Sequence, residues 1–186
     1  MNSDYRAELL TLLARESYVE RELNLSSGRA SNFYVDCKRT LYLPRGAYLA
    51  GELMFELVSA SRIGQIGGMA VGALPLTDTI IAAAHRHGAD LTGFFVRKET
   101  KAHGLQQRIE GAFRKERRTG VLDDTITTGG STLEAIAALR AAGAQVAAAF
   151  ALVDRNEGGR EAFAREGIPY AWVFTADEVR AAVRAG

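Results

Sequence analysis

The chain has 186 residues, of which 47% are hydrophobic and 24% charged, and this balance predicts one globular domain spanning residues 1–186. It excludes a disordered or collagen-like chain, and no run of about 18 apolar residues suggests a membrane span. The formal net charge of +1 argues against a strongly basic protein, so we expect neither nucleic acid nor membrane as a partner.

The N-terminal part predicts helices around a short extended region. Ser3 and Asp4 precede a stripe of leucines, which predicts a capped first helix. Residues 18–25 and 32–36 are typical of two extended segments joined by a turn-like loop. Pro44 is suited to the first turn of a helix, and the apolar stripe behind it predicts that this helix runs to residue 60.

From residue 65 onward, strands alternate with helices. The predicted strands are 65–71, 91–96, 119–122, 145–153 and 170–174, and the predicted helices are 76–87, 131–142, 160–166 and a C-terminal helix. This order indicates an α/β fold, with a central, mainly parallel sheet flanked by helices and ligands at the carboxyl ends of the strands. Residues 97–118 interrupt the alternation, and a polar segment of that length predicts a functional loop.

The positive charge is concentrated in that same segment. Residues 97–118 contain eight basic and three acidic residues, whereas the rest of the chain sums to −4. Four groups that are or can become cationic, Arg97, Lys98, Lys101 and His103, fall within seven residues and would attract a diphosphate. The alternative is a charge run that is simply solvated.

Residues 118–132 carry the most informative motif. A short strand is predicted to lead into Asp123 and Asp124, and a loop rich in hydroxyls and glycine then opens a helix. Gly129 and Gly130 let backbone N–H groups turn inward at the helix N-terminus, where a phosphate can sit. The two carboxylates can instead accept hydrogen bonds from sugar hydroxyls or face a metal ion. The plainer alternative is that the acids end a strand and Ser131 caps the helix.

This motif resembles the phosphoribosyl diphosphate (PRPP) signature of the type I phosphoribosyltransferases. The resemblance implies that Asp123 and Asp124 hold the ribose hydroxyls, while the loop that follows cradles the 5′-phosphate. The PRPP-binding residues that it implies are Arg97, Lys98, Lys101, His103, Asp123, Asp124, Thr125, Ile126, Thr127, Thr128, Gly129, Gly130 and Ser131. The chain contains neither G-x-x-x-x-G-K-[ST] nor G-x-G-x-x-G after a strand, which argues against an ordinary ATPase or a dinucleotide enzyme.

Three further motifs are similar to the orotate phosphoribosyltransferase family in particular. R-K-x-x-K-x-H-G from Arg97, followed by I-E-G, is similar to that family's catalytic loop. S-G-x-x-S-x-x-Y-x-D from Ser27 and the D-R pair at Asp154 are similar to its base-binding segments. The similarity covers about residues 20–160, in the right order. It implies Lys101 and His103 as catalytic groups, and Phe33, Tyr34, Thr127 and Arg155 as orotate-binding residues.

The resemblance also implies a reaction and a domain plan. The reaction converts orotate and PRPP to orotidine 5′-monophosphate and diphosphate, in de novo pyrimidine (UMP) biosynthesis. The expected fold is the type I phosphoribosyltransferase fold with a small N-terminal hood (residues 1–40) and a flexible catalytic loop (residues 97–111). Mg²⁺ is expected as cofactor, held mainly by PRPP with Asp123 and Asp124 as candidate protein ligands, and the expected assembly is a homodimer with shared active sites.

Two positions depart from the pattern of some relatives. Ser26 and Gly72 stand where a lysine can occur, so the resemblance assigns no lysine contact at either position. Two other functions stay open: transfer to a purine or to uracil, and a regulator that keeps the PRPP site but does no chemistry. The loop motif and Arg155 argue against the first alternative, and the lack of a DNA-recognition element argues against the second.

The remaining reactive side chains receive plainer interpretations. The single cysteine, Cys37, excludes a disulfide within the chain and favours a reducing compartment. Because the N-terminus does not resemble a signal peptide, we expect a cytoplasmic protein in which Cys37 is a packed side chain. His85 and His87 lie near a predicted helix C-terminus, where they would complement the helix dipole or, less expectedly, hold a metal.

Overall fold

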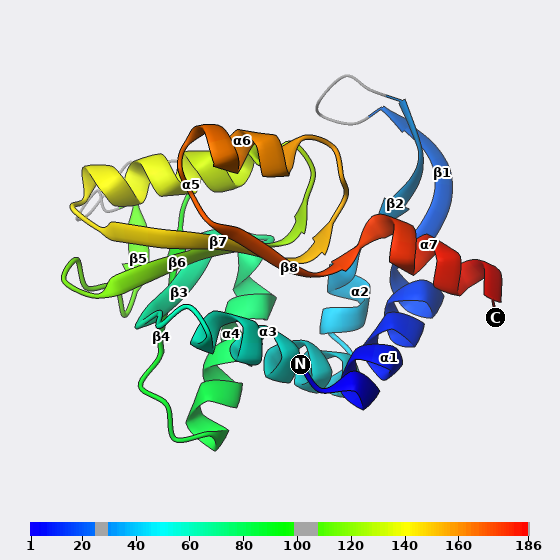
Figure 1. Cartoon of the computed structure of the whole chain (residues 1–186), viewed down its shortest axis with the longest axis horizontal. Coiled ribbons are helices and arrows are strands. Elements are labelled where there is room, and N and C mark those ends of the chain that lie inside the picture. Colours follow the sequence, from blue (N-terminus) through cyan, green and yellow to red (C-terminus); the bar gives the residue numbers. More distant parts are fainter. Residues whose placement is uncertain (25–29, 99–107, 186) are drawn as a thin grey trace.

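The structure is a computed structural model that describes residues 1–24, 30–98 and 108–185 (Figure 1). Its helices are α1 (Ser3–Leu12), with a π-helical turn η1 (Leu13–Ser17), α2 (Cys37–Leu41), α3 (Pro44–Ser59), α4 (Ala73–Arg86), α5 (Gly130–Ala141), α6 (Gly159–Arg165) and α7 (Ala176–Ala185). Its strands are β1 (Tyr18–Asn24), β2 (Ala30–Val35), β3 (Gln65–Met69), β4 (Thr92–Val96), β5 (Ile109–Gly111), β6 (Arg118–Ile126), β7 (Gln145–Asp154) and β8 (Tyr170–Thr175).

The first helix begins as predicted, but a different residue caps it. The side chain of Asn2 accepts hydrogen bonds from the backbone N–H groups of Asp4 and Tyr5, each at 3.1 Å. Asn caps a helix as well as Ser or Asp does, so the correction changes the capping residue and not the helix.

The two extended segments of the N-terminal part are confirmed as an antiparallel hairpin. β1 pairs with β2 in a two-stranded sheet that stands apart from the main one in Figure 1. The short helix α2 follows β2 directly and was not predicted. Its five residues span little more than one turn, too short for a helical period to show in the sequence.

Six strands among the described residues form the main sheet, in the order β5-β4-β3-β6-β7-β8. The β3–β4, β3–β6, β6–β7 and β7–β8 pairs are parallel, and only the β4–β5 pair is antiparallel. The prediction of an α/β fold with a mainly parallel sheet is therefore confirmed. Parallel strands need crossover connections, and the helices between them provide these.

Helices cover both faces of the main sheet. Neighbouring residues on a strand point to opposite faces, so Leu122 packs into the core with α3 and α4 while Val121 packs with α5 and α6. Figure 1 shows these two helix layers on opposite sides of the strands. Among the described residues, none of the helices combines the length and the apolar composition that a membrane crossing needs.

Two boundaries in the main sheet correct the sequence prediction. Residues 109–111, placed in the long loop, form β5, because three residues pair with the edge strand β4 without any periodic signal of their own. β6 continues to Ile126, four residues beyond the predicted end, because β7 runs beside it and pairs as far as Asp154. The two acids therefore belong to a strand and not to the loop after it.

Candidate active site

Two adjacent carboxylates, Asp123 and Asp124, lie near the carboxyl end of β6. The Asp124 N–H donates to Asp123 Oδ1 at 3.0 Å, and the Thr125 N–H donates to Asp124 Oδ1 at 2.8 Å. Burial, strengthened by the charge of Asp124, raises the pKa of Asp123 to about 8, and burial also raises the pKa of Asp124. A pair that retains a proton near neutral pH can both accept and donate hydrogen bonds, as two neighbouring hydroxyls of a ligand require.

A cation contributed by α2 faces this pair. Lys38 Nζ lies 3.3 Å from Asp124 Oδ2 and 3.0 Å from Asp36 Oδ1. Burial favours the neutral amine, but the negative charge of Asp124 and the hydrogen bond to Asp36 outweigh it, so the pKa of Lys38 is raised. Sequence reasoning did not place Lys38 in the site, because 86 residues separate it from Asp124.

The loop between β3 and α4 passes directly over the acids. A Cβ atom added to Gly72 would lie 2.6 Å from Asp123 Oδ1 and 3.3 Å from Asp124 Oδ1. A side chain at position 72 would therefore displace the Asp123 carboxylate in this arrangement. Position 72 is thus a glycine, and not a lysine, where the loop packs closely against the acids. Ser26, the other position that departs from the pattern, lies outside the described residues.

The segment between β6 and α5 has the features of an anion site. Gly129 takes a left-handed conformation (φ +80°) immediately before α5, and the Leu133 N–H donates to its carbonyl at 2.8 Å. Gly129 is therefore the N-cap residue of α5, and the interpretation of Ser131 as its cap is wrong. Thr128, Gly130 and Ser131 are exposed at the helix N-terminus, where N–H groups and the helix dipole favour a phosphate.

The three residues before Thr128, two at the end of β6 and one after it, are less open to solvent. Thr125 Oγ1 lies 3.3 Å from Cys37 Sγ and 3.4 Å from the Val35 carbonyl, so its hydroxyl faces the end of the β1–β2 hairpin. The Ile126 side chain is buried in the core, which leaves its backbone as the part that can reach a ligand. Thr127 comes next; it is half-buried and lies at the start of the turn that leads into α5.

Arg155, Phe33 and Tyr34 come together beside that turn. The Arg155 guanidinium is fully buried, and its Nη2 lies 3.2 Å from the Phe33 carbonyl and 2.7 Å from Glu157 Oε1. Its Cζ lies 5.2 Å from the Phe33 ring centre and 6.0 Å from that of Tyr34. The Arg155 N–H donates to the Ile126 carbonyl at 2.9 Å, which places this cluster next to the carboxyl end of β6.

The neighbouring Asp154 has a structural role. Its buried carboxylate accepts hydrogen bonds from Arg160 Nε at 2.5 Å and from the Asn156 N–H at 2.8 Å, and these fix the turn that presents Arg155. The Arg160 guanidinium in turn lies 3.9 Å from the Trp172 ring centre. Sequence reasoning missed both Glu157 and this network, since charged residues in a turn carry no signal of what they contact.

The basic segment begins at the same edge of the sheet. Arg97 and Lys98 follow the carboxyl end of β4, and the Arg97 N–H donates to the Arg108 carbonyl at 2.8 Å. The Arg97 side chain pairs with Glu110 at 3.2 Å, and Lys98 is exposed. Lys101 and His103, the predicted catalytic groups, lie outside the described residues.

Cys37 and His87 have structural surroundings. Cys37 is buried, and burial raises the pKa of its thiol, in agreement with a packed side chain. His87 stacks on Phe55 with ring centres 5.0 Å apart, and its Nε2 lies 2.7 Å from Glu52 Oε2. The described residues contain no group of three or more His, Cys, Asp and Glu side chains that could hold a metal ion by themselves.

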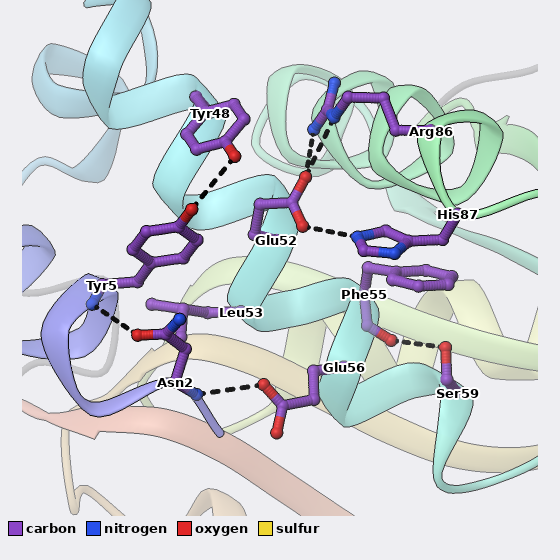
Figure 2. A pocket seen from close by; sticks show the side chains of 10 residues that line it. All are labelled: Asn2, Tyr5, Tyr48, Glu52, Leu53, Phe55, Glu56, Ser59, Arg86 and His87. Atoms are coloured by element: carbon purple, nitrogen blue, oxygen red, sulfur yellow. Dashed lines mark hydrogen bonds and ion pairs between the residues drawn. The ribbon is translucent and has the colours of Figure 1, made fainter.

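Figure 2 shows a separate cavity of about 640 Å³, lined by residues of α1, α3 and α4 and by those just before α1 and after α4. Its polar groups pair with one another: Arg86 and His87 both bind Glu52, and the Tyr5 and Tyr48 hydroxyls are 3.2 Å apart. The cavity includes none of the predicted site residues. Its side chains instead fasten the N-terminus to the helix layer beneath the sheet.

The sheet and the site together define a class of protein. An acidic pair lies at the carboxyl end of a parallel strand, a glycine-rich turn opens the next helix, and a basic segment follows a neighbouring strand at the same edge. This combination has the groups that suit a sugar, through its hydroxyls, and a phosphate, through backbone N–H groups. It defines a type I phosphoribosyltransferase.

Comparisons with known proteins narrow the class, although no family model matches the chain. The orotate phosphoribosyltransferase of Bradyrhizobium sp. (strain BTAi1) is 41% identical over 177 residues, which cover 93% of this chain and 96% of that protein. That of Streptomyces coelicolor is 39% identical, with 95% and 98% covered. The crystal structure of Mycobacterium tuberculosis orotate phosphoribosyltransferase in complex with PRPP has a TM-score of 0.80 at 35% identity, with 94% and 98% covered. The chain belongs to the orotate phosphoribosyltransferase family.

Proposed function

We propose that the protein transfers the phosphoribosyl group of PRPP to orotate, giving orotidine 5′-monophosphate and diphosphate in UMP biosynthesis. The observation that carries this proposal is the buried Arg155 guanidinium near the Phe33 and Tyr34 rings, beside the strand that bears the acidic pair. A guanidinium fork suits the carboxylate of a planar base, and the aromatic rings suit its faces.

Each part of PRPP has a matching group. The 5′-phosphate would bind the exposed N–H groups and hydroxyls between Thr127 and Ser131, at the N-terminus of α5. The ribose hydroxyls would bind Asp123 and Asp124, which can accept and donate hydrogen bonds because burial raises their pKa values. The diphosphate would then extend toward Arg97 and the residues that follow it.

The chemistry requires stabilisation of the charge that develops on the leaving diphosphate. The bond between C1 of the ribose and the diphosphate oxygen breaks, the diphosphate leaves with the electron pair, and N1 of orotate bonds to C1 as its proton is released. We infer that Lys101 and His103 stabilise the charge that develops on the leaving diphosphate. Of the residues 97–111 predicted as a loop, the part that links β4 to β5 would close over the site and keep water away from the reacting carbon.

The acidic pair also fits Mg²⁺. Magnesium binds through one or two carboxylates together with substrate phosphates, and its charge would favour the ionised form of Asp123 against the burial that raises the pKa of this group. Asp123 and Asp124 would hold the ion with PRPP and water. When bound, the ion would neutralise diphosphate charge and orient the sugar.

We further propose a homodimer located in the cytoplasm. The homodimer is what the family resemblance implies, and Val71, 66% exposed in the loop beside the acids, is one apolar side chain that such a contact would cover. In that dimer the loop of one protomer would reach the site of its partner. A single buried thiol suits a reducing compartment. Light scattering during gel filtration measures the assembly directly.

The reaction is tested by following orotate absorbance after PRPP is added, with and without Mg²⁺. The proposal expects loss of orotate absorbance that requires both PRPP and the metal and stops in excess chelator. Adenine, guanine and uracil, assayed as acceptors in parallel, should give no product. Turnover of one of those bases in place of orotate would contradict the proposed function.

A further inference from the structure

Three carboxylates and one ammonium group meet where α2 approaches β6. Asp36 precedes α2, Asp123 and Asp124 lie on β6, and Lys38 Nζ contacts both Asp36 and Asp124. The motifs that resemble known families do not include Lys38, and the reaction described above does not use it. An ammonium with two carboxylate partners, 37% exposed beside a ligand site, needs an explanation of its own.

Lys38 completes the set of groups that fix the Asp124 carboxylate. One oxygen, Oδ1, accepts the Thr125 N–H at 2.8 Å, and the other, Oδ2, faces Lys38 Nζ at 3.3 Å. With an anchor on each oxygen, the carboxylate plane of Asp124 is defined before a ligand arrives. Lys38 also offsets the repulsion between the two adjacent acids, which would otherwise turn the side chains apart.

The position of Lys38 is itself set by the backbone around it. Asp36 binds the ammonium at 3.0 Å, and the neighbouring Cys37 contacts Thr125 through Sγ and Oγ1 at 3.3 Å. The Thr125 hydroxyl also lies 3.4 Å from the Val35 carbonyl. Four consecutive residues at the end of the hairpin, 35–38, therefore take part in one junction with the acidic strand.

We propose that Lys38 is a positioning residue of the PRPP site, which holds Asp124 in the orientation that receives the ribose hydroxyls. This inference rests on the proposed function, because it assigns the ribose to the acidic pair. It predicts that loss of the ammonium weakens PRPP binding far more than orotate binding, since Lys38 acts on Asp124 and the orotate cluster lies around Arg155.

The test compares four proteins: wild type, Lys38→Met, Lys38→Arg, and Arg39→Met as the matched control. Arg39 is the next residue on α2 and is exposed. PRPP binding is measured by calorimetry in the presence of Mg²⁺, and the KM values for both substrates and kcat are measured by orotate absorbance. Thermal unfolding of each variant is recorded alongside.

We expect Lys38→Met to weaken PRPP binding and raise its KM by about 10–100-fold, the effect of losing one charge-assisted hydrogen bond. The orotate KM should change less than threefold. Lys38→Arg should recover most of the affinity, and Arg39→Met should match wild type. PRPP affinity within twofold of wild type in Lys38→Met, or equal rises in both KM values, would overturn the assignment.

Two further measurements distinguish a failure of this inference from a variant that does not fold and from a failure of the proposed function. If Lys38→Met does not fold, Lys38→Gln is measured instead; it keeps a donor without the charge and should weaken PRPP binding by at least severalfold, while unchanged affinity would overturn the inference. Because calorimetry measures PRPP alone, a wild-type protein that binds PRPP but does not consume orotate contradicts the proposed function and still leaves Lys38 tested. A wild-type protein that does not bind PRPP contradicts both.

Discussion

A single methyl group added at position 72 should lower the affinity for PRPP without lowering the stability of the protein. Gly72 has right-handed helical backbone angles (φ −58°, ψ −45°) just before α4, so alanine fits its backbone without strain. Replacing glycine by alanine at such a position usually stabilises a protein by about 0.4–1 kcal/mol, because the unfolded chain loses freedom. On backbone grounds alone, Gly72→Ala should be neutral or stabilising.

The surroundings of the added methyl predict the opposite effect on the ligand. It would lie 2.6 Å from Asp123 Oδ1, which is closer than atoms that do not bond to each other normally approach, so the Asp123 carboxylate must turn away. That carboxylate also accepts the Asp124 N–H at 3.0 Å, so its movement disturbs both acids. Loss of one hydrogen bond to a charged group costs about 1.5–3 kcal/mol, or about 10–150-fold in PRPP affinity.

Calorimetric titration with PRPP and thermal unfolding of the same samples test this reasoning. The control is Gly64→Ala at the opposite end of β3, where an added methyl would meet atoms no closer than 3.8 Å. Gly64→Ala should leave PRPP affinity unchanged. If Gly72→Ala binds PRPP as wild type does, Asp123 has room to move without loss, and its assigned contact with the ribose is wrong.

Three further predictions concern other parts of the site. Arg155→Lys should raise the orotate KM by at least tenfold and the PRPP KM much less, because a lysine cannot reproduce the guanidinium fork; steady-state kinetics measures both. Lys101→Ala should lower kcat by about 10²–10³ with little change in KM, as when a donor to developing negative charge is removed. The Cys37 thiol should resist alkylation in the folded protein at pH 8, because burial raises its pKa and leaves it protonated, whereas one thiol per chain should react in denaturant.

Each of these has an outcome that would count against it. Equal increases in both KM values for Arg155→Lys would mean that Arg155 supports the fold rather than the base. An unchanged kcat for Lys101→Ala would remove that residue from the chemistry. Rapid alkylation of native Cys37 would show that the junction between α2 and β6 opens in solution.

Much of the fold was predictable because it depends on local patterns. The alternation of strands and helices from β3 to α7 follows from runs of apolar residues separated by glycine and polar turns. The elements that escaped prediction are short. Neither α2, with five residues, nor β5, with three, is long enough to show a period. Each depends on the neighbour against which it packs.

The site likewise contains residues that a local sequence pattern reveals and residues that only the structure reveals. Asp123, Asp124 and the glycine turn before α5 are adjacent in sequence, so their motif could be found without a structure. Lys38 joins them across 86 residues, and Glu157 reaches Arg155 only because the turn between β7 and α6 folds back. Tertiary packing brings Lys38 to the acids, whereas a local turn brings Glu157 to Arg155, and neither contact follows from residue spacing.

The acidic pair shows why the site lies at the end of a strand rather than within a mobile loop. Two partly buried carboxylates with raised pKa values are unfavourable in the free protein, so they persist only where the surrounding structure holds them. β6 is held on one side by β7, whose last seven residues are all buried, and on the other by β3. Lys38 and the backbone N–H groups then fix the carboxylates in place. The packed core beneath the acids thus offsets the cost of burying two adjacent carboxyl groups.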